Sequence, residues 1–266
     1  MDGGTEETRE FGSVGTTLRR HVATMHIGGG DQNVMRTDTY SDLRDAVQWC
    51  ADEPDVRVVV LIGRGPNFSV GGDHRVHKER DVHDFRRHLS ILMGTATIMR
   101  TMGKPIIAAV RGKCTGGMNQ IALLSDLTLA SETARFGQYG ARSGSLPSLW
   151  GTQLLPLAIG EKRAREMVYM CWEYTAAEAY EMGLVNRVVA DDRLEAEVDR
   201  WTDRLLEMSP RSLRFAKTSM NLGSDLRTTG IWHARDALSE WAGTDEHKQA
   251  IDSYVEGTKP PWYPEA

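Results

Sequence analysis

The sequence predicts an α/β fold in which a mostly parallel sheet comes first and a helical layer follows. Short β-branched runs such as Val56–Gly63 (VRVVVLIG) are typical of strands that are buried on both faces. Segments of helical period alternate with these strands, which favours parallel pairing. After Gly151 the pattern becomes mostly helical. These three observations together indicate one sheet core with a helical C-terminal part.

The predicted elements follow in a regular order along the chain. Val22–Ile27 (VATMHI) alternates as a strand does, and a glycine loop at Gly28–Asn33 separates it from a helix over Thr39–Ala51. Further buried strands are expected at Val56–Gly63, Pro105–Val110 and Leu127–Ala130. A long helix is expected between the first two of these strands, at Val82–Met102. The helical part should comprise Gly160–Cys171, Ala176–Met182, Asp192–Met208, Arg211–Gly223 and Trp232–Glu256.

Three regions are predicted from these patterns. The first dozen residues (MDGGTEETREFG) carry several acids and no apolar stretch, so residues 1–15 are predicted to be a disordered tail and not a signal peptide. Residues 16–195 should form the α/β core. Residues 196–266 should form a C-terminal helical segment.

The composition of the 266 residues limits the possible partners. The net charge is −5 and the pI is near 5.9, so no general basic surface exists to bind nucleic acid. The longest apolar runs are far shorter than the roughly 20 residues that a membrane helix needs, and no membrane partner is expected. Three cysteines lie far apart without metal spacing, which indicates a reducing compartment and predicts a cytoplasmic protein.

Two glycine turns stand at the ends of predicted strands. The first, Asn67–His74 (NFSVGGDH), follows the strand at Val56–Gly63, and the second, Arg111–Gln120 (RGKCTGGMNQ), follows the strand at Pro105–Val110. Glycines let backbone N–H groups approach a ligand closely, and two N–H donors that converge on one oxygen make an oxyanion hole. On spacing alone, a purely structural pair of tight turns is equally consistent with these residues.

A family resemblance decides between these interpretations. NFSVGGD, followed by KPIIAAVRGKCTGGMNQIALLSDLTLASETARFGQ and then by GTQLLPLAIGEKRAREMVYM, AAEAYEMGLVNRVV and SPRSLRFAKTSMN, resembles the crotonase (enoyl-CoA hydratase/isomerase) superfamily. The resemblance covers roughly residues 22–254. It implies a ClpP-like spiral of ββα units with a C-terminal helical trimerisation segment, and a homotrimer or a dimer of trimers. It also implies a coenzyme A thioester as substrate, no tightly bound cofactor, and oxyanion-hole amides at Gly72 and Gly117.

The resemblance departs from the hydratase pattern at both catalytic carboxylates. Hydration needs a base for water and an acid for carbon, and the family supplies them with two glutamates. Here Gln120 and Gly140 stand at these positions. An amide has no useful proton affinity, and glycine has no side chain, so ordinary hydration is disfavoured.

The segment FGQYGARSGS resembles a subgroup that makes or breaks C–C bonds in cyclic acyl-CoA compounds, that of 1,4-dihydroxy-2-naphthoyl-CoA synthase and 2-ketocyclohexanecarboxyl-CoA hydrolase. In some of these synthases the glycine leaves room for a bicarbonate that acts as base. The resemblance implies that Gln138 and Ser145 contact that anion or the substrate. Departures from the subgroup are found at Met118, Pro147, Val168 and Ala242.

Other residues are candidates for the missing acid and base. His74 follows the first glycine turn directly, and its imidazole could titrate near neutrality, although it could also simply line the pocket. Tyr139 could hydrogen-bond an enolate or fill the pocket. His77 lies four residues after Asp73, but a metal site there would require a helix where the sequence indicates a loop, so no metal is expected. Lys217 matches a family lysine that could contact a CoA phosphate, although a solvated charge is an alternative.

The sequence therefore predicts an enzyme, a lyase or hydrolase of this superfamily, that stabilises the enolate of a cyclic or β-keto acyl thioester during C–C bond formation or cleavage. Three alternatives stay open: an enoyl-CoA hydratase/isomerase, a hydrolase of β-diketones that do not carry CoA, and a catalytically silent binding trimer. The substrate, the reaction direction, the acyl carrier and the choice between trimer and hexamer are not specified by the sequence.

Overall fold

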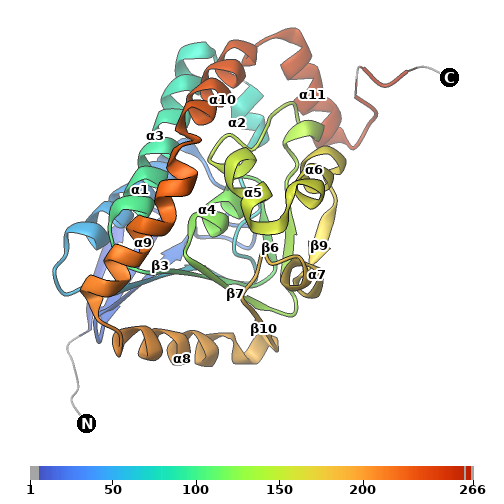
Figure 1. Ribbon diagram of the computed structural model, residues 1–266. Helices are drawn as coiled ribbons and strands as arrows, with labels where there is room; N and C mark the ends of the chain where they lie inside the picture. The colour runs from blue at the N-terminus through green and yellow to red at the C-terminus, as the bar shows by residue number, and fades with distance from the viewer. Residues whose placement is uncertain (1–5, 79, 261, 265–266) are drawn as a thin grey trace.

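The computed structural model describes residues 6–78, 80–260 and 262–264. Its main sheet has seven strands in the order β1-β2-β3-β4-β5-β7-β10 (Figure 1). Their bounds are Glu7–Phe11 (β1), Val14–Arg19 (β2), Val22–Ile27 (β3), Val58–Gly63 (β4), Ile106–Val110 (β5), Leu127–Ser131 (β7) and Arg187–Val189 (β10). The first three strands pair antiparallel and the rest pair parallel. The predicted mostly parallel sheet is confirmed, and the four strands predicted in it agree to within two residues.

Alternating side chains of the parallel strands divide the core into two layers. Val59 and Leu61 of β4 face the large cluster beneath α1 (Thr37–Asp52), α3 (Val82–Thr101) and α4 (Gly117–Leu124). Val60 faces the opposite layer, where it packs with residues of α8 (Leu194–Leu206). Figure 1 shows α8 beneath the sheet, on the side away from α3. Continuous apolar runs are required here because both faces of each strand are buried.

A second, smaller sheet has three strands. It consists of β6 (Lys113–Thr115), β8 (Arg135–Gly137) and β9 (Glu173–Thr175), in that order. The remaining short helical elements are α2 (His74–Lys78), η1 (Gly140–Arg142), α5 (Gly151–Ile159), α6 (Glu161–Met170), α7 (Ala176–Glu181) and η2 (Asp191–Arg193). The sequence did not predict β6, β8, β9 or β10, because three-residue strands are too short to show a period.

The C-terminal helices pack beside the first long helices (Figure 1). They are α9 (Pro210–Asp225), α10 (Thr228–Trp241) and α11 (Asp245–Glu256); α9 and α10 contact α3, and α11 contacts α2. The single helix predicted over Trp232–Glu256 is wrong. The helix is interrupted at Gly243, which has a positive φ of 78°. The Thr244 hydroxyl then accepts the N–H of His247 at the start of α11.

Two further sequence predictions require correction. The tail predicted at residues 1–15 is wrong for Glu7–Phe11 and Val14–Gly15, which belong to β1 and β2; residues 1–5 lie outside the described residues. Because β1 is an exposed edge strand, it tolerates the charges that suggested disorder. The loop predicted around Asp73 and His77 is wrong as well, since residues 74–78 form α2.

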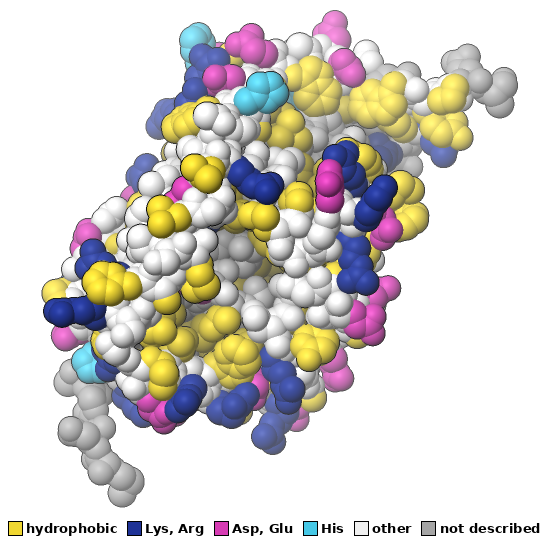
Figure 2. Space-filling view, viewed as in Figure 1, with side chains coloured by type: hydrophobic (Ala, Val, Ile, Leu, Met, Phe, Trp, Pro, Cys, Tyr) yellow, Lys and Arg dark blue, Asp and Glu magenta, His cyan; other side chains and the backbone are white. Residues whose placement is uncertain are grey.

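Several large apolar side chains are exposed on α9 and just beyond it, namely Phe215, Met220, Leu222 and Leu226. Figure 2 shows hydrophobic side chains over this face, interspersed with Lys and Arg. An exposed apolar face of this kind indicates a protein contact surface, which is consistent with the predicted trimerisation. Within the described part of the chain, no helix is both long and apolar enough to cross a membrane.

Candidate active site

The two glycine turns predicted from the sequence lie in backbone contact. A parallel bridge joins Ser69 to Cys114, and the Thr115 hydroxyl donates to Val70 O over 2.9 Å. A Cβ atom at Gly71 would lie 2.8 Å from Thr115 O and 3.5 Å from the amide nitrogen of Gly117. Gly71 also has φ of 90°, which favours glycine. Only a glycine therefore lets the first turn approach the second this closely.

Two backbone amides at this contact have no acceptor. Neither the N–H of Gly72 nor that of Gly117 donates a hydrogen bond to any described residue. Gly117 is the first residue of α4, where the amides of the first turn are free and the helix dipole is positive. Both glycines border the same cavity. The turns thus present two free donors at one place, as an oxyanion hole requires.

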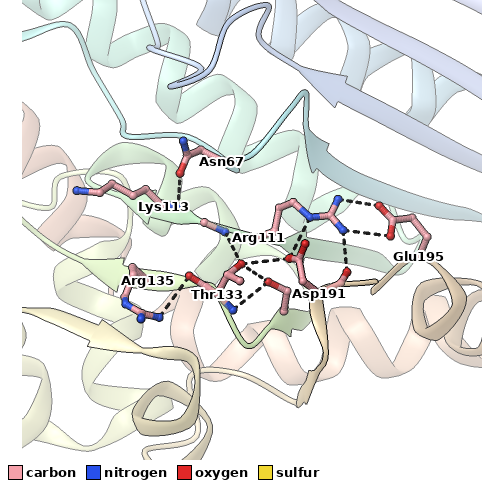
Figure 3. Close-up of polar contacts among 9 residues, drawn as sticks. Asn67, Arg111, Lys113, Thr133, Arg135, Asp191 and Glu195 are labelled. Atoms are coloured by element: carbon pink, nitrogen blue, oxygen red, sulfur yellow. Dashed lines mark hydrogen bonds and ion pairs between the residues drawn. The ribbon is translucent and has the colours of Figure 1, made fainter. Parts of the chain in front are cut away.

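Figure 3 shows how the second turn is anchored at its base. The Arg111 guanidinium donates to the Glu195 carboxylate over 2.7 and 3.1 Å and to Asp191 over 3.3 Å. The N–H of Lys113 donates to the side-chain oxygen of Asn67 over 2.7 Å, which links the second turn to the first. These contacts restrain the backbone that carries the free amides.

Gln120 and Gln138 form an amide network beneath the second turn. The Gln120 amide donates to Gly116 O over 3.3 Å, and its oxygen accepts the N–H of Leu149 over 2.7 Å. The Gln138 amide donates to the same Gly116 O over 3.3 Å and to the side chain of Asn119 over 2.8 Å. Both glutamines are almost completely buried and border the cavity. Their hydrogen bonds hold the residue that precedes Gly117, so the two side chains position the amide.

The space beside Gly140 is filled by the chain itself. A Cβ atom at Gly140 would lie 2.9 Å from Ser145 O and 3.0 Å from the nitrogen of Leu146. Ser145 N–H donates to Gly140 O over 2.7 Å, which closes this turn tightly. A side chain at position 140 would therefore require this backbone to shift. Gly140 and Ser145 still border the cavity.

Tyr139 and His74 lie where the inner cavity meets an outer cleft. The inner cavity has a volume of about 80 Å³, the outer cleft has about 1020 Å³, and both are bordered by Gly72, His74 and Tyr139. The Tyr139 hydroxyl donates to the Glu173 carboxylate, which also pairs with Lys113 over 2.9 Å. Both side chains border the same cavity as Gly72 and Gly117, and their catalytic roles stay predictions.

Three cations that the sequence analysis missed border the outer cleft: Arg36, Arg75 and Lys113. Arg36 stands just before α1 and Arg75 lies in α2, so their proximity could not be inferred from spacing. The cleft also contains Asp31 and Asp73. Its cations could bind the phosphates of a nucleotide.

Four histidines border the inner cavity, and the sequence analysis selected only His74. The others are His77 of α2, His88 of α3 and His247 of α11. Burial lowers the pKa of all four imidazoles, to about 3 for His88. The rings are therefore neutral at pH 7. No group of three or more His, Cys, Asp or Glu side chains in the described ranges is placed to hold a metal ion.

His77 has the most direct relation to the two glycine turns. Its Nε2 is buried and has no hydrogen-bond partner. A Cβ atom at Gly72 would lie 3.1 Å from this nitrogen. A group bound at the Gly72 amide would therefore lie next to an unpaired imidazole nitrogen.

Lys217 lies outside this site. Its ammonium is buried and pairs with Asp126 over 2.8 Å, and it donates to Lys104 O over 3.0 Å. The predicted contact between Lys217 and a CoA phosphate finds no support in this geometry, because the ammonium already has two partners inside the protein.

Comparisons with known proteins agree with this fold. The family model described as enoyl-CoA hydratase/isomerase matches residues 18–265. An enoyl-CoA hydratase from Mycobacterium avium subsp. paratuberculosis K-10 is 24% identical with a TM-score of 0.86, over 95% of this chain and 99% of that chain. An enoyl-CoA hydratase/isomerase from Xanthobacter autotrophicus Py2 is 27% identical with a TM-score of 0.79, over 92% of each chain. DspI of Pseudomonas aeruginosa is 26% identical with a TM-score of 0.76, over 83% of this chain and 90% of that chain.

The family model spans nearly the whole chain, and the similarity to the Mycobacterium avium structure covers 95% of it. The α/β crotonase fold expected from the sequence is therefore confirmed. The chain belongs to the enoyl-CoA hydratase/isomerase family.

Proposed function

We propose that this protein shifts the double bond of short enoyl-CoA thioesters, with the enolate held on two backbone amides and the proton moved by imidazole. One observation carries the proposal. The free amides of Gly72 and Gly117 border a cavity whose ionisable side chains, among the described residues, are imidazoles and phenols, with no carboxylate. A neutral imidazole can accept a proton from carbon at pH 7.

The thioester oxygen would accept the N–H groups of Gly72 and Gly117. These amides stabilise the negative charge that develops when the proton on C2 leaves, each by about 3–4 kcal/mol. His77 is the best-placed base because its Nε2 is unpaired and adjacent to Gly72. The imidazolium would then return the proton to C4, and the double bond moves from C3–C4 to C2–C3.

Isomerisation requires one group that takes and returns a proton, whereas hydration requires a base for water and a separate acid for carbon. The replacement of both family glutamates by Gln120 and Gly140 therefore favours isomerisation. Ring-forming or ring-opening C–C chemistry has less support, because the matching family model and the similar solved structures are those of enoyl-CoA hydratases and isomerases.

Turnover of trans-3-pentenoyl-CoA in D2O tests this proposal. The expected product is 2-pentenoyl-CoA, separated from the substrate by chromatography, and it should carry little deuterium because the imidazolium returns the proton that it took from C2. A His77→Gln variant should lose at least about 100-fold in kcat, as expected for removal of a general base. His83→Gln is the matched control, since His83 is exposed on the neighbouring helix and should retain activity.

Other products would contradict the proposal in defined ways. Formation of 3-hydroxypentanoyl-CoA from 2-pentenoyl-CoA would establish hydration instead. Tight binding of the thioesters without formation of 2-pentenoyl-CoA would indicate a silent binding protein. Cleavage of a free cyclic β-diketone, with no turnover of CoA thioesters, would favour the hydrolase alternative.

A further inference from the structure

The inner cavity contains hydrogen-bond donors that have no acceptor among the described residues. His88 and His247 border the inner cavity but not the outer cleft, and both rings are about 2% exposed. Their surroundings are otherwise apolar, with Phe85, Leu89 and Leu238 in the same wall. The hydrogen bonds behind each ring determine which nitrogen carries its proton.

His247 is fixed as an Nε2–H donor by the backbone. Its Nδ1 lies 3.1 Å from the nitrogen of Gly243, whose N–H can only donate. Nδ1 is therefore the acceptor, and the neutral ring carries its hydrogen on Nε2. The interruption of the helix at Gly243, between α10 and α11, creates this contact.

His88 is linked to Arg80 through Thr37. The Arg80 guanidinium, which can only donate, gives a hydrogen bond to the Thr37 hydroxyl over 2.5 Å. The hydroxyl keeps one hydrogen to donate and one lone pair to accept, and it lies 3.4 Å from Nδ1 of His88. When the hydroxyl donates, the neutral His88 ring carries its hydrogen on Nε2 as His247 does, and both imidazoles are N–H donors in the same cavity wall.

Arg80 adds a buried positive charge behind these rings. It is only 7% exposed, its Nη1 is buried without a partner, and no carboxylate of the described residues lies within 4.0 Å of it. Asp84 and Asp73 act on the Arg80 charge from a greater distance. Burial of a charge is costly, and an anion bound nearby would reduce that cost.

An alkyl chain would leave all of these donors unsatisfied, whereas a carboxylate would accept both imidazole hydrogens and lie in the field of Arg80. We propose that the inner end of the cavity binds a carboxylate at the far end of the acyl chain, so that the preferred substrates are short monothioesters of dicarboxylic acids. This inference rests on the acyl-CoA function proposed above. The cavity volume of about 80 Å³ favours a short chain.

Calorimetric titration with glutaryl-CoA and valeryl-CoA tests this inference, because the two acyl chains have five carbons and differ at C5 as carboxylate and methyl. Glutaryl-CoA is expected to bind at least tenfold more tightly. Arg80→Met should abolish that preference. Arg87→Met, which removes an exposed arginine of α3, is the matched control and should retain the preference.

The comparison of the two thioesters on the unaltered protein does not depend on the folding of any variant. Equal affinity, or tighter binding of valeryl-CoA, would overturn the inference and leave the acyl-CoA function standing. Strengthening of valeryl-CoA binding by added bicarbonate would also overturn it, since a free anion would then occupy the donors. If neither thioester binds, the proposed function fails, and this inference fails with it.

Discussion

The hydroxyl of Tyr40, from helix α1, occupies the space into which a side chain on Gly117 would project. Tyr40 is 2% exposed, so this hydroxyl cannot easily move away. The requirement for glycine at the second turn therefore arises from a helix that begins about eighty residues earlier in the chain. This relationship also allows the Gly117 amide to be tested without a steric clash.

In a Tyr40→Phe background, Gly117→Ala and Gly117→Pro separate the amide from the side chain. Without the hydroxyl, the nearest atom to the new Cβ is Cζ at 3.5 Å, an ordinary contact. Both variants should fold, because proline is tolerated at the first position of a helix. The alanine variant keeps the N–H and should remain active, whereas the proline variant should lose about 10²–10³-fold in kcat. Equal activity of the two variants would show that the Gly117 amide has no catalytic role.

The glycine turns and the buried strands could be predicted because their signals are local. A run such as Val58–Gly63 is apolar at every position that two packed layers require, and a pair of glycines marks a turn without reference to distant residues. The edge strand Glu7–Phe11 was missed because an exposed strand carries no apolar pattern. The break at Gly243 was missed because the flanking helical patterns continue across it.

The histidine cluster could not be predicted for a different reason. His247 borders the same cavity as His77 and His88 only because α11 packs against α2, and no spacing in the sequence expresses that packing. The tautomer of His247 depends on a single hydrogen bond from Gly243, which is a tertiary feature. Sequence reasoning accordingly found the two glycine turns and selected one histidine of the four.

Acidification should destabilise the protein well above the pH at which carboxylates titrate. In the unfolded chain His88 takes up a proton near its ordinary pKa of 6.5, whereas burial lowers the pKa in the folded state to about 3. Between these values the unfolded state binds more protons, so stability is lost as the pH falls below 6.5. His88 alone should contribute about 1.4 kcal/mol per pH unit, and the lowered pKa values of His74, His77 and His247 act in the same direction.

Urea unfolding at pH 7.5, 6.0 and 5.0 measures this dependence. His88→Gln should reduce the slope of the unfolding free energy against pH by the contribution of one proton. His83→Gln, which alters an exposed ring, serves as the control and should leave the slope unchanged. A slope that is the same in the unaltered protein and in His88→Gln would contradict the assigned burial of this imidazole.

Removal of Lys217 should affect stability and not substrate binding. Lys217→Met leaves Asp126 without its buried partner, at an expected cost of about 2–3 kcal/mol, less than for a fully buried pair because the Asp126 side chain is 29% exposed. A further Asp126→Asn change should recover part of this loss, since an amide oxygen can still accept the N–H of Ile106. The KM for acyl-CoA should remain unchanged. A raised KM at full stability would instead support the CoA contact suggested by the sequence.

Removal of positive charges from the outer cleft should selectively weaken the binding of CoA thioesters. No carboxylate of the described ranges lies within ion-pair distance of Arg36 or Arg75, so both guanidinium groups are available to phosphate. Arg36→Gln combined with Arg75→Gln should raise the KM for trans-3-pentenoyl-CoA about tenfold, mainly at low ionic strength, where exposed charges act most strongly. The kcat should change little, because neither side chain borders the inner cavity.

The same variant should show no change in KM with the N-acetylcysteamine thioester of the same acid, which has the acyl group but no phosphates. Arg87→Gln, which removes one exposed arginine outside the cleft, provides a control for the loss of surface charge. An equal rise in KM for both thioesters would mean that the two arginines maintain the shape of the cleft and do not bind phosphate. Unchanged KM for both would place the nucleotide elsewhere, because the strongest unpaired charges of the cleft would then have no part in binding it.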